Sequence, residues 1–487
     1  MCAMRTYLAI DLGAESGRVV RGRLGGGSIT LEEIRRFPTG TVSILGRKHW
    51  NLIRLYEEML AAFRAVGGSG GAESVGVDSW GVDFVLLGED GQPTGLPFAY
   101  RDGRTDGIME KFFQIVPAAQ VYAATGIQFM QFNTLFQLFA MAQAKSPQLS
   151  AARSLLMIPD YFHHLFGGGS VTEFTNASTT ACLNVHTRQW DFDLLGRPGI
   201  PSHIFQRLVQ PGTPVGRLTQ ELQSLTGMGD IPIIAPATHD TASAVAAVPA
   251  EGDDWAYISS GTWSLMGVEI PRPLATQQAR AFNFTNEGGV NGMTRLLKNV
   301  VGLWLVQQLR AGFDVSYDYP ALMELASQAQ AFRSLIDPAD ARFLAPQSMP
   351  QAFADFCRCT NQPVPETPGQ YVRCALESLA MQYRLVLGQL RQMQDRPINR
   401  IHIIGGGSKN TLLCQLTADA CGLPVLAGPA EGTALGNLII QAMSLGHISS
   451  LAEGRAIIRN SFELVEYQPQ PNRRLDAAWE NFMSLKQ

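Results

Sequence analysis

The sequence has few cysteines, no cluster of basic residues and no long apolar run. Its seven cysteines in 487 residues are too few for a disulfide framework, and an odd number leaves at least one unpaired. The 38 lysines and arginines stand against 42 acids, without the basic patch that nucleic-acid binding requires. No apolar stretch reaches the ~18 residues of a membrane span, and Asp11 precedes any run of signal-peptide length. We therefore expect a cytoplasmic protein with no nucleic-acid or membrane partner.

The spacing of the cysteines and histidines predicts no structural metal. Cys357 and Cys359 are separated by one residue, whereas zinc and redox pairs have two between them. His163 and His164 are adjacent, so their side chains point in different directions. We expect the cysteines to be reduced thiols, most of them packed in the interior.

The composition that remains is typical of a globular chain. Apolar residues make up 46% and charged residues 16% of the sequence, which excludes the disordered class. A chain of 487 residues exceeds the ~250 to 300 residues at which a single core stops growing. We expect two domains, residues 1–247 and 248–487.

The two halves begin with the same order of elements. Residues 7–12 read as an apolar strand, residues 13–17 as a glycine-containing turn and residues 18–24 as a second strand. Residues 255–260, 261–262 and 263–270 repeat this order. The repeat is weak in residue identity and clearer in the order of elements, and it predicts two related halves.

The first turn has two interpretations. Asp11 ends an apolar strand and is followed by small residues and glycines, an arrangement in which successive N–H groups bind phosphate oxygens. The acid could also hold Mg²⁺ through water. The alternative is an ordinary hairpin turn, because Asp and Gly are common turn residues. Glu15 would repel phosphate unless only its N–H faces the ligand.

Two sites in the second half have a similar ambiguity. Gly405, Gly406 and Gly407 follow the apolar strand 401–404, so a nucleotide could approach a backbone that carries no Cβ. A flexible strand-to-helix turn explains the same residues. The segment 259–262, Ser-Ser-Gly-Thr, could donate hydroxyl hydrogen bonds to phosphate or could simply precede a strand.

Asp240 stands between the strand 231–237 and a predicted helix. At this position an aspartate often serves as the helix N-cap. A carboxylate within about 3 Å of a substrate hydroxyl could also accept its proton during phosphoryl transfer. The two roles are compatible, since a capped carboxylate is held in place.

Several motifs lie in order along nearly the whole chain. They are Asp11–Arg18, Asp78–Asp83, Ala99–Asp102, Met157–Tyr161, Thr238–Thr241, Ser259–Ser264 and Gly405–Gly407, with Thr285–Gly289 (Thr-Asn-Glu-Gly-Gly) in addition. Taken together, these motifs resemble the FGGY family of carbohydrate kinases. Some of them, including Thr285–Gly289, are more specific to members that phosphorylate L-rhamnulose than to the family at large.

The resemblance implies an α/β fold of two actin-like (ribonuclease H-like) ATPase domains, the N-terminal one binding sugar and the C-terminal one binding ATP. It also implies Mg²⁺ as a cofactor, with Asp11 near the metal through water and Asp240 as the catalytic base. The implied sugar-binding residues are Gly81, His239, Asp240, Thr241 and Asn299. The implied ATP-binding residues are Ala14, Glu15, Ser16, Gly17, Arg18, Thr262, Gln307 and Gly406.

The implied reaction is transfer of the γ-phosphoryl group of ATP to O1 of L-rhamnulose in rhamnose catabolism. Related kinases act on xylulose, ribulose, fuculose or glycerol, and these sugars and polyols are the first alternative. A non-enzymatic actin-like ATPase is the second. The resemblance also allows a disulfide between Cys357 and Cys374, but we expect these two cysteines to be free here. We expect a monomer or a small homo-oligomer.

Overall fold

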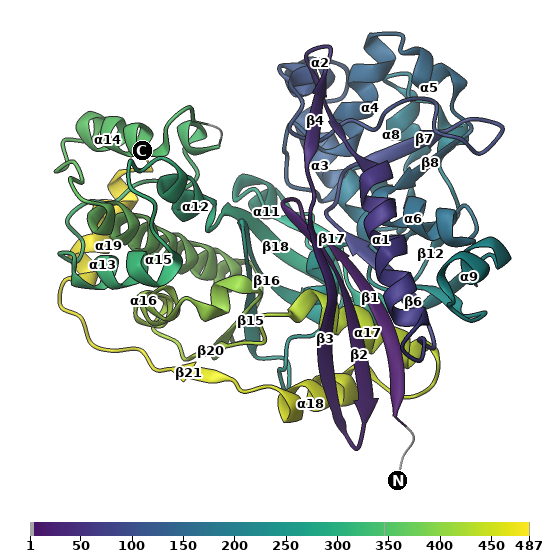
Figure 1. Ribbon diagram of the computed structural model, residues 1–487. Coiled ribbons are helices and arrows are strands. Elements are labelled where there is room, and N and C mark those ends of the chain that lie inside the picture. The colour runs from purple at the N-terminus through teal and green to yellow at the C-terminus, as the bar shows by residue number, and fades with distance from the viewer. Residues whose placement is uncertain (1–3, 345, 487) are drawn as a thin grey trace. The chain divides into compact units, whose positions relative to one another are not determined.

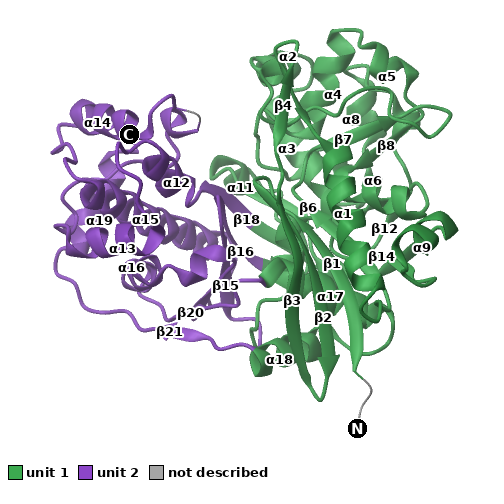
Figure 2. Cartoon of the chain, viewed as in Figure 1, with its two compact units in different colours: residues 1–251, 269–296, 432–461 green, residues 252–268, 297–431, 462–487 purple. Residues whose placement is uncertain are grey.

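The computed structural model describes residues 4–344 and 346–486. The chain forms two compact units (Figure 2). Unit 1 contains residues 1–251, 269–296 and 432–461, and unit 2 contains residues 252–268, 297–431 and 462–487. The chain enters unit 2 at Gly252 and returns to unit 1 twice. The assignment of residues 1–247 and 248–487 to two domains with separate functions stays a prediction.

Unit 1 is built on a six-stranded sheet of order β13-β14-β6-β1-β2-β3 (Figure 1). The predicted opening hairpin is present, because β1 pairs antiparallel with β2 and Asp11 lies opposite Arg18. On its other edge β1 pairs parallel with β6, and Asp11 lies beside Asp78. The strands are β1 (Arg5–Leu12), β2 (Ser16–Gly25), β3 (Ser28–Pro38), β6 (Val75–Ser79), β13 (Thr213–Arg217) and β14 (Pro232–Ala235).

Helices cover both faces of this sheet. On one face, α1 (Leu52–Gly67) and α6 (Ile158–Phe166) pack apolar side chains against the strands. On the other face, α17 (Gly432–Ser444) approaches β2 so closely that a Cβ at Gly22 would lie 2.6 Å from Leu438. Since α17 comes from the end of the chain, the core of unit 1 closes only when distant segments meet.

Residues 103–226 of unit 1 form a mainly helical region, which agrees with the helical spacing of residues 112–165. Within residues 112–165 the one strand is β8 (Ser154–Met157), which pairs with β7 (Phe84–Leu87). The helices are α2 (Ile108–Ile115), α3 (Ala118–Thr125), α4 (Thr134–Gln143), α5 (Pro147–Ala151), α6, α7 (Phe174–Ala177), α8 (Phe192–Gly196) and α9 (Gln220–Thr226). The short strands of unit 1 are β4 (Thr41–Ile44), β5 (Arg47–Trp50), β9 (Thr172–Glu173), β10 (Leu183–Asn184), β11 (Gln189–Trp190), β12 (Leu208–Val209) and β17 (Thr285–Gly288), and the helix α11 (Gln277–Ala281) precedes β17.

The sheet of unit 2 repeats the pairing found in unit 1, as the order of elements predicts. Its first strand, β15, pairs antiparallel with β16 and parallel with β19, as β1 does with β2 and β6. Both β16 and β18 contain residues of both units. The strands are β15 (Trp255–Ser260), β16 (Trp263–Ile270), β18 (Thr294–Val301), β19 (Arg400–Ile404), β20 (Val425–Ala427) and β21 (Val465–Tyr467).

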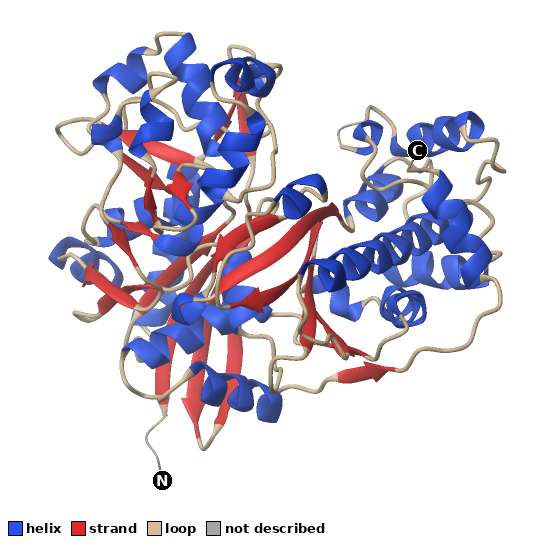
Figure 3. Ribbon diagram, turned by 180° about the vertical axis from the view of Figure 1, so that it is seen from behind, coloured by secondary structure: helices blue, strands red, loops and turns tan. Residues whose placement is uncertain are grey.

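The long helix α15 (Pro368–Met393) is the centre of the helical layer of unit 2 (Figure 3), and the sequence predicts a long helix from about residue 368 to residue 393. The sequence also predicts a helix around residues 300–309, and this prediction is wrong at its start. Val300 and Val301 end β18, and α12 begins at Trp304, because the β-branched valines continue a paired strand up to Gly302. The helices packed near α15 are α12 (Trp304–Ala311), α13 (Tyr319–Gln328), α14 (Met349–Cys359), α16 (Thr411–Cys421) and α19 (Leu475–Ser484).

Over residues 4–344 and 346–486, none of the helices has the length and apolar character needed to span a bilayer.

The two cysteines considered as a possible pair are not bonded to each other. Cys357 and Cys374 are buried free thiols, and burial raises the pKa of Cys357 to about 11. Cys2 lies outside the described residues.

Candidate functional site

Asp240 is the first residue of α10 (Asp240–Ala246) rather than its N-cap. His239 occupies the N-cap position and makes no capping bond with its side chain. The Oδ1 atom of Asp240 instead accepts the backbone N–H of Thr241 at 2.5 Å and its hydroxyl at 3.0 Å. The capping role considered for Asp240 is therefore wrong in position, because the chain becomes helical at Asp240 itself, one residue earlier than a cap at this position requires.

The environment of Asp240 favours a group that can exchange a proton. Burial raises the pKa of Asp240, the charge of His239 acts in the opposite direction, the charge of Asp11 adds to the rise, and the bonds from Thr241 lower it. The side chain nevertheless remains 28% exposed. A carboxylate that is partly buried, fixed by two donors and still accessible can receive a proton from a bound molecule.

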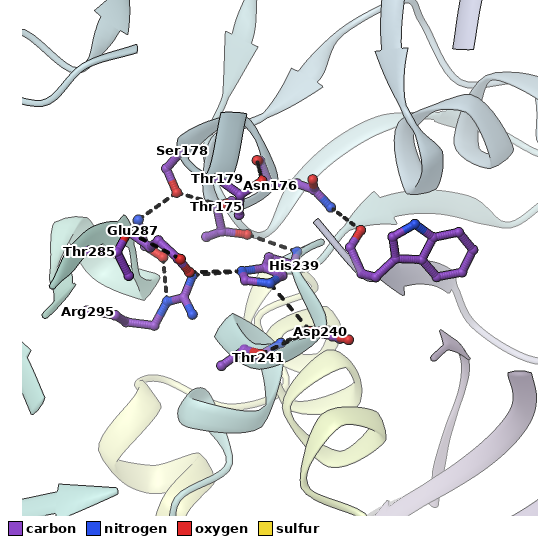
Figure 4. Close-up of polar contacts among 12 residues, drawn as sticks. Thr175, Asn176, Ser178, Thr179, His239, Asp240, Thr241, Thr285, Glu287 and Arg295 are labelled. Atoms are coloured by element: carbon purple, nitrogen blue, oxygen red, sulfur yellow. Dashed lines mark hydrogen bonds and ion pairs between the residues drawn. The ribbon is translucent and has the colours of Figure 1, made fainter. Parts of the chain in front are cut away.

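His239, beside Asp240, is surrounded by charged groups (Figure 4). Its Nε2 atom lies 3.5 Å from Asp240 Oδ1. Its Nδ1 atom lies 3.0 Å from Arg295 Nη2 and 3.3 Å from Glu287 Oε2. Burial alone would raise the pKa of Glu287, but the charge of Arg295 acts together with His239 and Thr285 to hold this pKa below its ordinary value. The histidine ring is thus held between two charged sites.

A buried carboxylate on the other side holds the backbone that leads to His239. Glu173 Oε2 accepts the backbone N–H of Thr238 at 2.9 Å and the Thr238 hydroxyl at 2.7 Å. It also accepts the hydroxyl of Thr175, whose Oγ1 in turn accepts the N–H of His239 at 3.2 Å. Burial raises the pKa of Glu173, and these donors lower it. The segment 238–240 therefore has little freedom to move.

Gly81 lies close to the same segment, as its predicted role requires. The strand residue Ser79 forms a parallel bridge with His239, which brings the chain that leads to Gly81 alongside the site. A Cβ at Gly81 would lie 2.7 Å from Thr179 Oγ1, the atom that accepts the N–H of Val82 at 3.1 Å. Glycine is needed here because a threonine fills the space in front of it.

Asp11 and Arg18 form an ion pair at the ends of β1 and β2. Arg18 Nη2 donates to Asp11 Oδ2 at 2.6 Å. Beside them, burial raises the pKa of Asp78 well above its ordinary value and the charge of Asp11 adds to the rise, whereas a hydrogen bond from Asn437 lowers it. Asp78 Oδ1 is buried without a hydrogen-bond partner. The charges of Asp11 and Asp240 therefore both raise the pKa of Asp78.

This carboxylate group matches the way Mg²⁺ is commonly held. Among residues 4–344 and 346–486, no cluster of three or more His, Cys, Asp or Glu side chains could bind a metal by itself. Proteins usually bind Mg²⁺ with one or two carboxylates, while water and substrate phosphates complete the octahedron. Asp11 and Asp78 at adjacent strand ends fit that pattern.

The turn between β1 and β2 contains Ala14 and Glu15, and Ser16 and Gly17 begin β2. The turn is closed by a bond from the Gly13 N–H to the Ser16 carbonyl at 3.1 Å. Thr39, the residue after β3, fixes the turn, since its N–H donates to the Glu15 carbonyl and its hydroxyl donates to the Gly13 carbonyl. The side chain of Glu15 is exposed, which leaves the backbone of the turn as the part able to meet an anion.

In unit 2 the structure brings together two of the predicted ATP-binding residues. Thr262 lies in the turn between β15 and β16, and its carbonyl accepts the N–H groups of Gly302 and Trp304 at 3.1 Å. Gln307, one turn into α12, points its Nε2 atom at Thr262 Oγ1 over 3.5 Å. Hydrogen bonds therefore hold this turn against the start of α12.

The three glycines after β19 have different reasons to be glycine. Gly405 has a φ of +81°, which glycine adopts without strain. A Cβ at Gly407 would lie 2.0 Å from Ser260 Oγ, whereas a Cβ at Gly406 would meet no atom within 4 Å. The turn thus packs on the end of β15 through Gly407 and leaves open space beside Gly406.

The predicted residues fall into one group in unit 1 and another in unit 2. Unit 1 holds the predicted sugar-binding residues with one exception, Asn299, which lies on the unit 2 part of β18. The sequence-based prediction missed Glu173, Thr175 and Arg295. A buried acid in the motif Thr-Glu-Phe-Thr-Asn at 172–176 could have indicated Glu173, but no local signal relates Arg295 to His239, which is 56 residues away.

The sequence of this chain is similar to those of known proteins over nearly its full length. Residues 6–247 match the N-terminal domain of the FGGY family of carbohydrate kinases and residues 256–445 match its C-terminal domain. A protein named rhamnulokinase from Bacteroides thetaiotaomicron is 48% identical over 480 residues, which cover 98% of this chain and 99% of the relative. A second rhamnulokinase, from Pectobacterium carotovorum, is 44% identical, with coverage of 100% and 97%.

Solved structures with low sequence identity share the fold. The gluconate kinase of Lactobacillus acidophilus has a TM-score of 0.82 at 18% identity and covers 99% of this chain and 97% of its own. The glycerol kinase of Plasmodium falciparum has a TM-score of 0.78 at 15% identity, with the same coverage. The predicted fold, an actin-like α/β architecture of two domains, is confirmed. From the full-length identity to its relatives and the match of both family domains, the chain belongs to the FGGY family of carbohydrate kinases.

Proposed function

We propose that this carbohydrate kinase transfers the γ-phosphoryl group of ATP to O1 of L-rhamnulose, giving L-rhamnulose 1-phosphate and ADP, in the catabolism of rhamnose. The observation that carries the proposal is 44–48% identity over nearly the full length to proteins named rhamnulokinase. The motif at 285–289, more specific to kinases of this sugar than to the family at large, is present in this chain as β17 and the residue that follows it.

In the proposed reaction Asp240 is the general base. As the bond between O1 and the γ-phosphorus forms and the bond to ADP breaks, the O1 proton passes to the Asp240 carboxylate. A carboxylate cannot ionise an alcohol in the ground state, so it acts late, when the hydroxyl has become acidic. Its bonds from Thr241 support this role because the geometry of the acceptor is fixed beforehand.

Gly81, His239, Thr241 and Asn299 are the proposed sugar-binding residues. Neighbouring backbone and side-chain groups in unit 1 hold the first three. The bridge between Ser79 and His239 supports the proposed place of Gly81 beside the other sugar-binding residues. Polar groups on a fixed backbone are what orients a small polar substrate.

The proposed ATP-binding residues are the turn Ala14–Arg18 in unit 1, and Thr262, Gln307 and Gly406 in unit 2. The open space beside Gly406 supports close approach of a nucleotide there. Mg²⁺ bound with the phosphates would neutralise the charge that develops on them, and Asp11, together with Asp78, would hold it through water. The cytoplasmic location and the oligomeric state stay predictions.

Release of ADP in the presence of a panel of acceptors tests this function. L-rhamnulose, L-fuculose, D-xylulose, D-ribulose and glycerol are compared at equal concentration, with a reaction lacking any acceptor as the control. We expect the highest kcat/KM with L-rhamnulose, and phosphorus–proton coupling in the product that assigns the phosphate to C1. A clear preference for another acceptor would replace the substrate, and ATP-dependent filament formation without any acceptor turnover would favour a non-enzymatic ATPase.

A further inference from the structure

A buried ion pair lies directly behind the ring of His239. Arg295, on β18, is completely buried, and its Nη2 atom lies 3.1 Å from Glu287 Oε2 on β17. Arg295 Nε donates to the carbonyl of Gly288 at 2.7 Å, which fixes the guanidinium plane. Both charged residues lie in or beside the 285–289 motif, to which the proposed reaction assigns no role. Buried charges are costly unless they are paired, so their position beside His239 calls for a reason.

The contact between Arg295 and His239 determines where the ring carries its proton. Arg295 Nη2 is 3.0 Å from Nδ1 of His239. A guanidinium has only donors and does not deprotonate in proteins, so Nδ1 must be the acceptor. A neutral imidazole with an accepting Nδ1 carries its hydrogen on Nε2. That nitrogen is the one that faces Asp240 Oδ1, at 3.5 Å.

Glu287 offers the opposite arrangement, in which Nδ1 would donate to a carboxylate. Its Oε2 atom is 3.3 Å from Nδ1, yet this oxygen makes no hydrogen bond of acceptable geometry. An N–H on Nδ1 would also point at the N–H of Arg295, and it would turn the lone pair of Nε2 toward the carboxylate of Asp240. Both contacts would be repulsive. The geometry therefore favours Arg295 as the hydrogen-bond partner of Nδ1, with Glu287 in an ion pair with Arg295 at 3.1 Å. Figure 4 shows these contacts.

We propose that Arg295 is a positioning residue that fixes His239 in the tautomer with hydrogen on Nε2, and that Glu287 compensates the charge of Arg295. The ring then presents a donor, not a second base, to the sugar oxygen bound beside Asp240. Asp240 is left as the proton acceptor of this pair. The part of the inference that concerns the sugar rests on the proposed function, whereas the tautomer does not.

The first experiment measures the tautomer in the full-length wild-type protein without ligand. Long-range ¹⁵N–¹H correlation on protein labelled with ¹⁵N-histidine distinguishes protonated from unprotonated ring nitrogens, and His239→Gln identifies the signals of His239. We expect an unprotonated Nδ1 and a protonated Nε2. A protonated Nδ1 in the wild-type protein would overturn the inference, and this result needs no variant to fold.

The second experiment removes the ion pair. Glu287→Gln combined with Arg295→Met removes both charges, so that neither is left buried alone. We expect a mixture of His239 tautomers and a fall in kcat of about 10- to 100-fold, as misplacement of a reacting group produces, with the KM for ATP unchanged. Arg295→Lys retains a cationic donor, and we expect it to recover the wild-type tautomer and part of the lost kcat.

Arg21→Met is the matched control, since Arg21 is also buried but donates to Glu32 and Ser69 instead. It should lower stability without changing the His239 tautomer. If the double variant kept the wild-type tautomer, Arg295 would not be the residue that fixes it. If the tautomer changed as expected while the wild-type enzyme failed to phosphorylate L-rhamnulose, the proposed substrate would be wrong and the role of Arg295 would stand.

Discussion

The Oδ1 atom of Asp240 accepts both the backbone N–H and the hydroxyl of Thr241, the next residue of α10. Two adjacent residues at the start of one helix therefore fix the carboxylate that we propose as the base. The helix itself is held against α17, where a Cβ at Gly436 would lie 1.7 Å from the Ser243 carbonyl oxygen. Placement of this carboxylate depends on packing between segments that are far apart in the sequence.

Asp240→Asn should remove the proton acceptor and keep the shape of the site. We expect kcat for sugar phosphorylation to fall about 100- to 10,000-fold, the usual contribution of general acid–base catalysis. Calorimetric titration with ATP should give an unchanged affinity, which serves as the control for folding. Undiminished turnover would remove Asp240 from the mechanism.

Thr241→Val should change the dependence of kcat/KM on pH. The substitution removes a hydrogen-bond donor, and the valine side chain has nearly the same volume as threonine. The Thr241 hydroxyl bond lowers the pKa of Asp240, so its loss raises this pKa. Because the base must be ionised to accept a proton, activity is lost as the pH falls through this pKa. We therefore expect the acid limb of kcat/KM against pH to move to higher pH in the variant. A shift to lower pH would contradict the assignment of that limb to Asp240.

Two neighbouring glycines should respond differently to the same added methyl group. Gly406→Ala meets open space, and Gly406 does not have a positive φ, so we expect its free energy of unfolding to change by less than about 0.5 kcal/mol. Gly407→Ala places its Cβ 2.5 Å from Ser260 Cβ, and we expect a loss of about 1–3 kcal/mol from overpacking. Urea denaturation of both variants measures the difference.

The kinetic effects of the same pair test the nucleotide site. If ATP lies against Gly406, the added methyl group should raise the KM for ATP in a protein that is otherwise as stable as the wild type. An unchanged KM for ATP in Gly406→Ala would exclude close approach of the nucleotide at this position. Gly407→Ala serves as the comparison in which stability is lost.

Asp83→Asn should change how stability depends on pH. Asp83 accepts hydrogen bonds from Trp50, Trp80, Gln137 and the backbone of Tyr100, but burial outweighs them and raises its pKa from 3.8 to about 6. A raised pKa means that the folded state binds the proton more tightly than the unfolded state. Its contribution to stability therefore increases as the pH falls from about 6 to about 4.

The measurement is urea unfolding of the wild type and of Asp83→Asn at several pH values between 7 and 4. Other groups titrate in both proteins, so they cancel in the difference between the two free energies of unfolding. This difference, wild type minus variant, should become more favourable to the wild type as the pH falls through that interval. A constant difference would show that Asp83 titrates at its ordinary pKa.

Much of the secondary structure could be predicted from local patterns. The strand at β1, the turn after it and the 26-residue helix α15 follow from apolar periodicity, which reports burial one element at a time. The start of α12 was misplaced because Val300 and Val301 carry apolar side chains in a strand as well as in a helix. A short apolar run does not distinguish the two without its pairing partners.

The sequence by itself determined that this chain is a globular α/β protein with two related halves, and its motifs in chain order indicated the kinase family and Asp240. Only the tertiary structure decided what surrounds that residue. Asn437 reaches Asp78 from 359 residues away, and Arg295 reaches His239 from 56 residues away. Buried charges and hydrogen bonds depend on partners within about 3 Å. Packing and strand register determine those distances, whereas periodicity and composition describe one segment at a time.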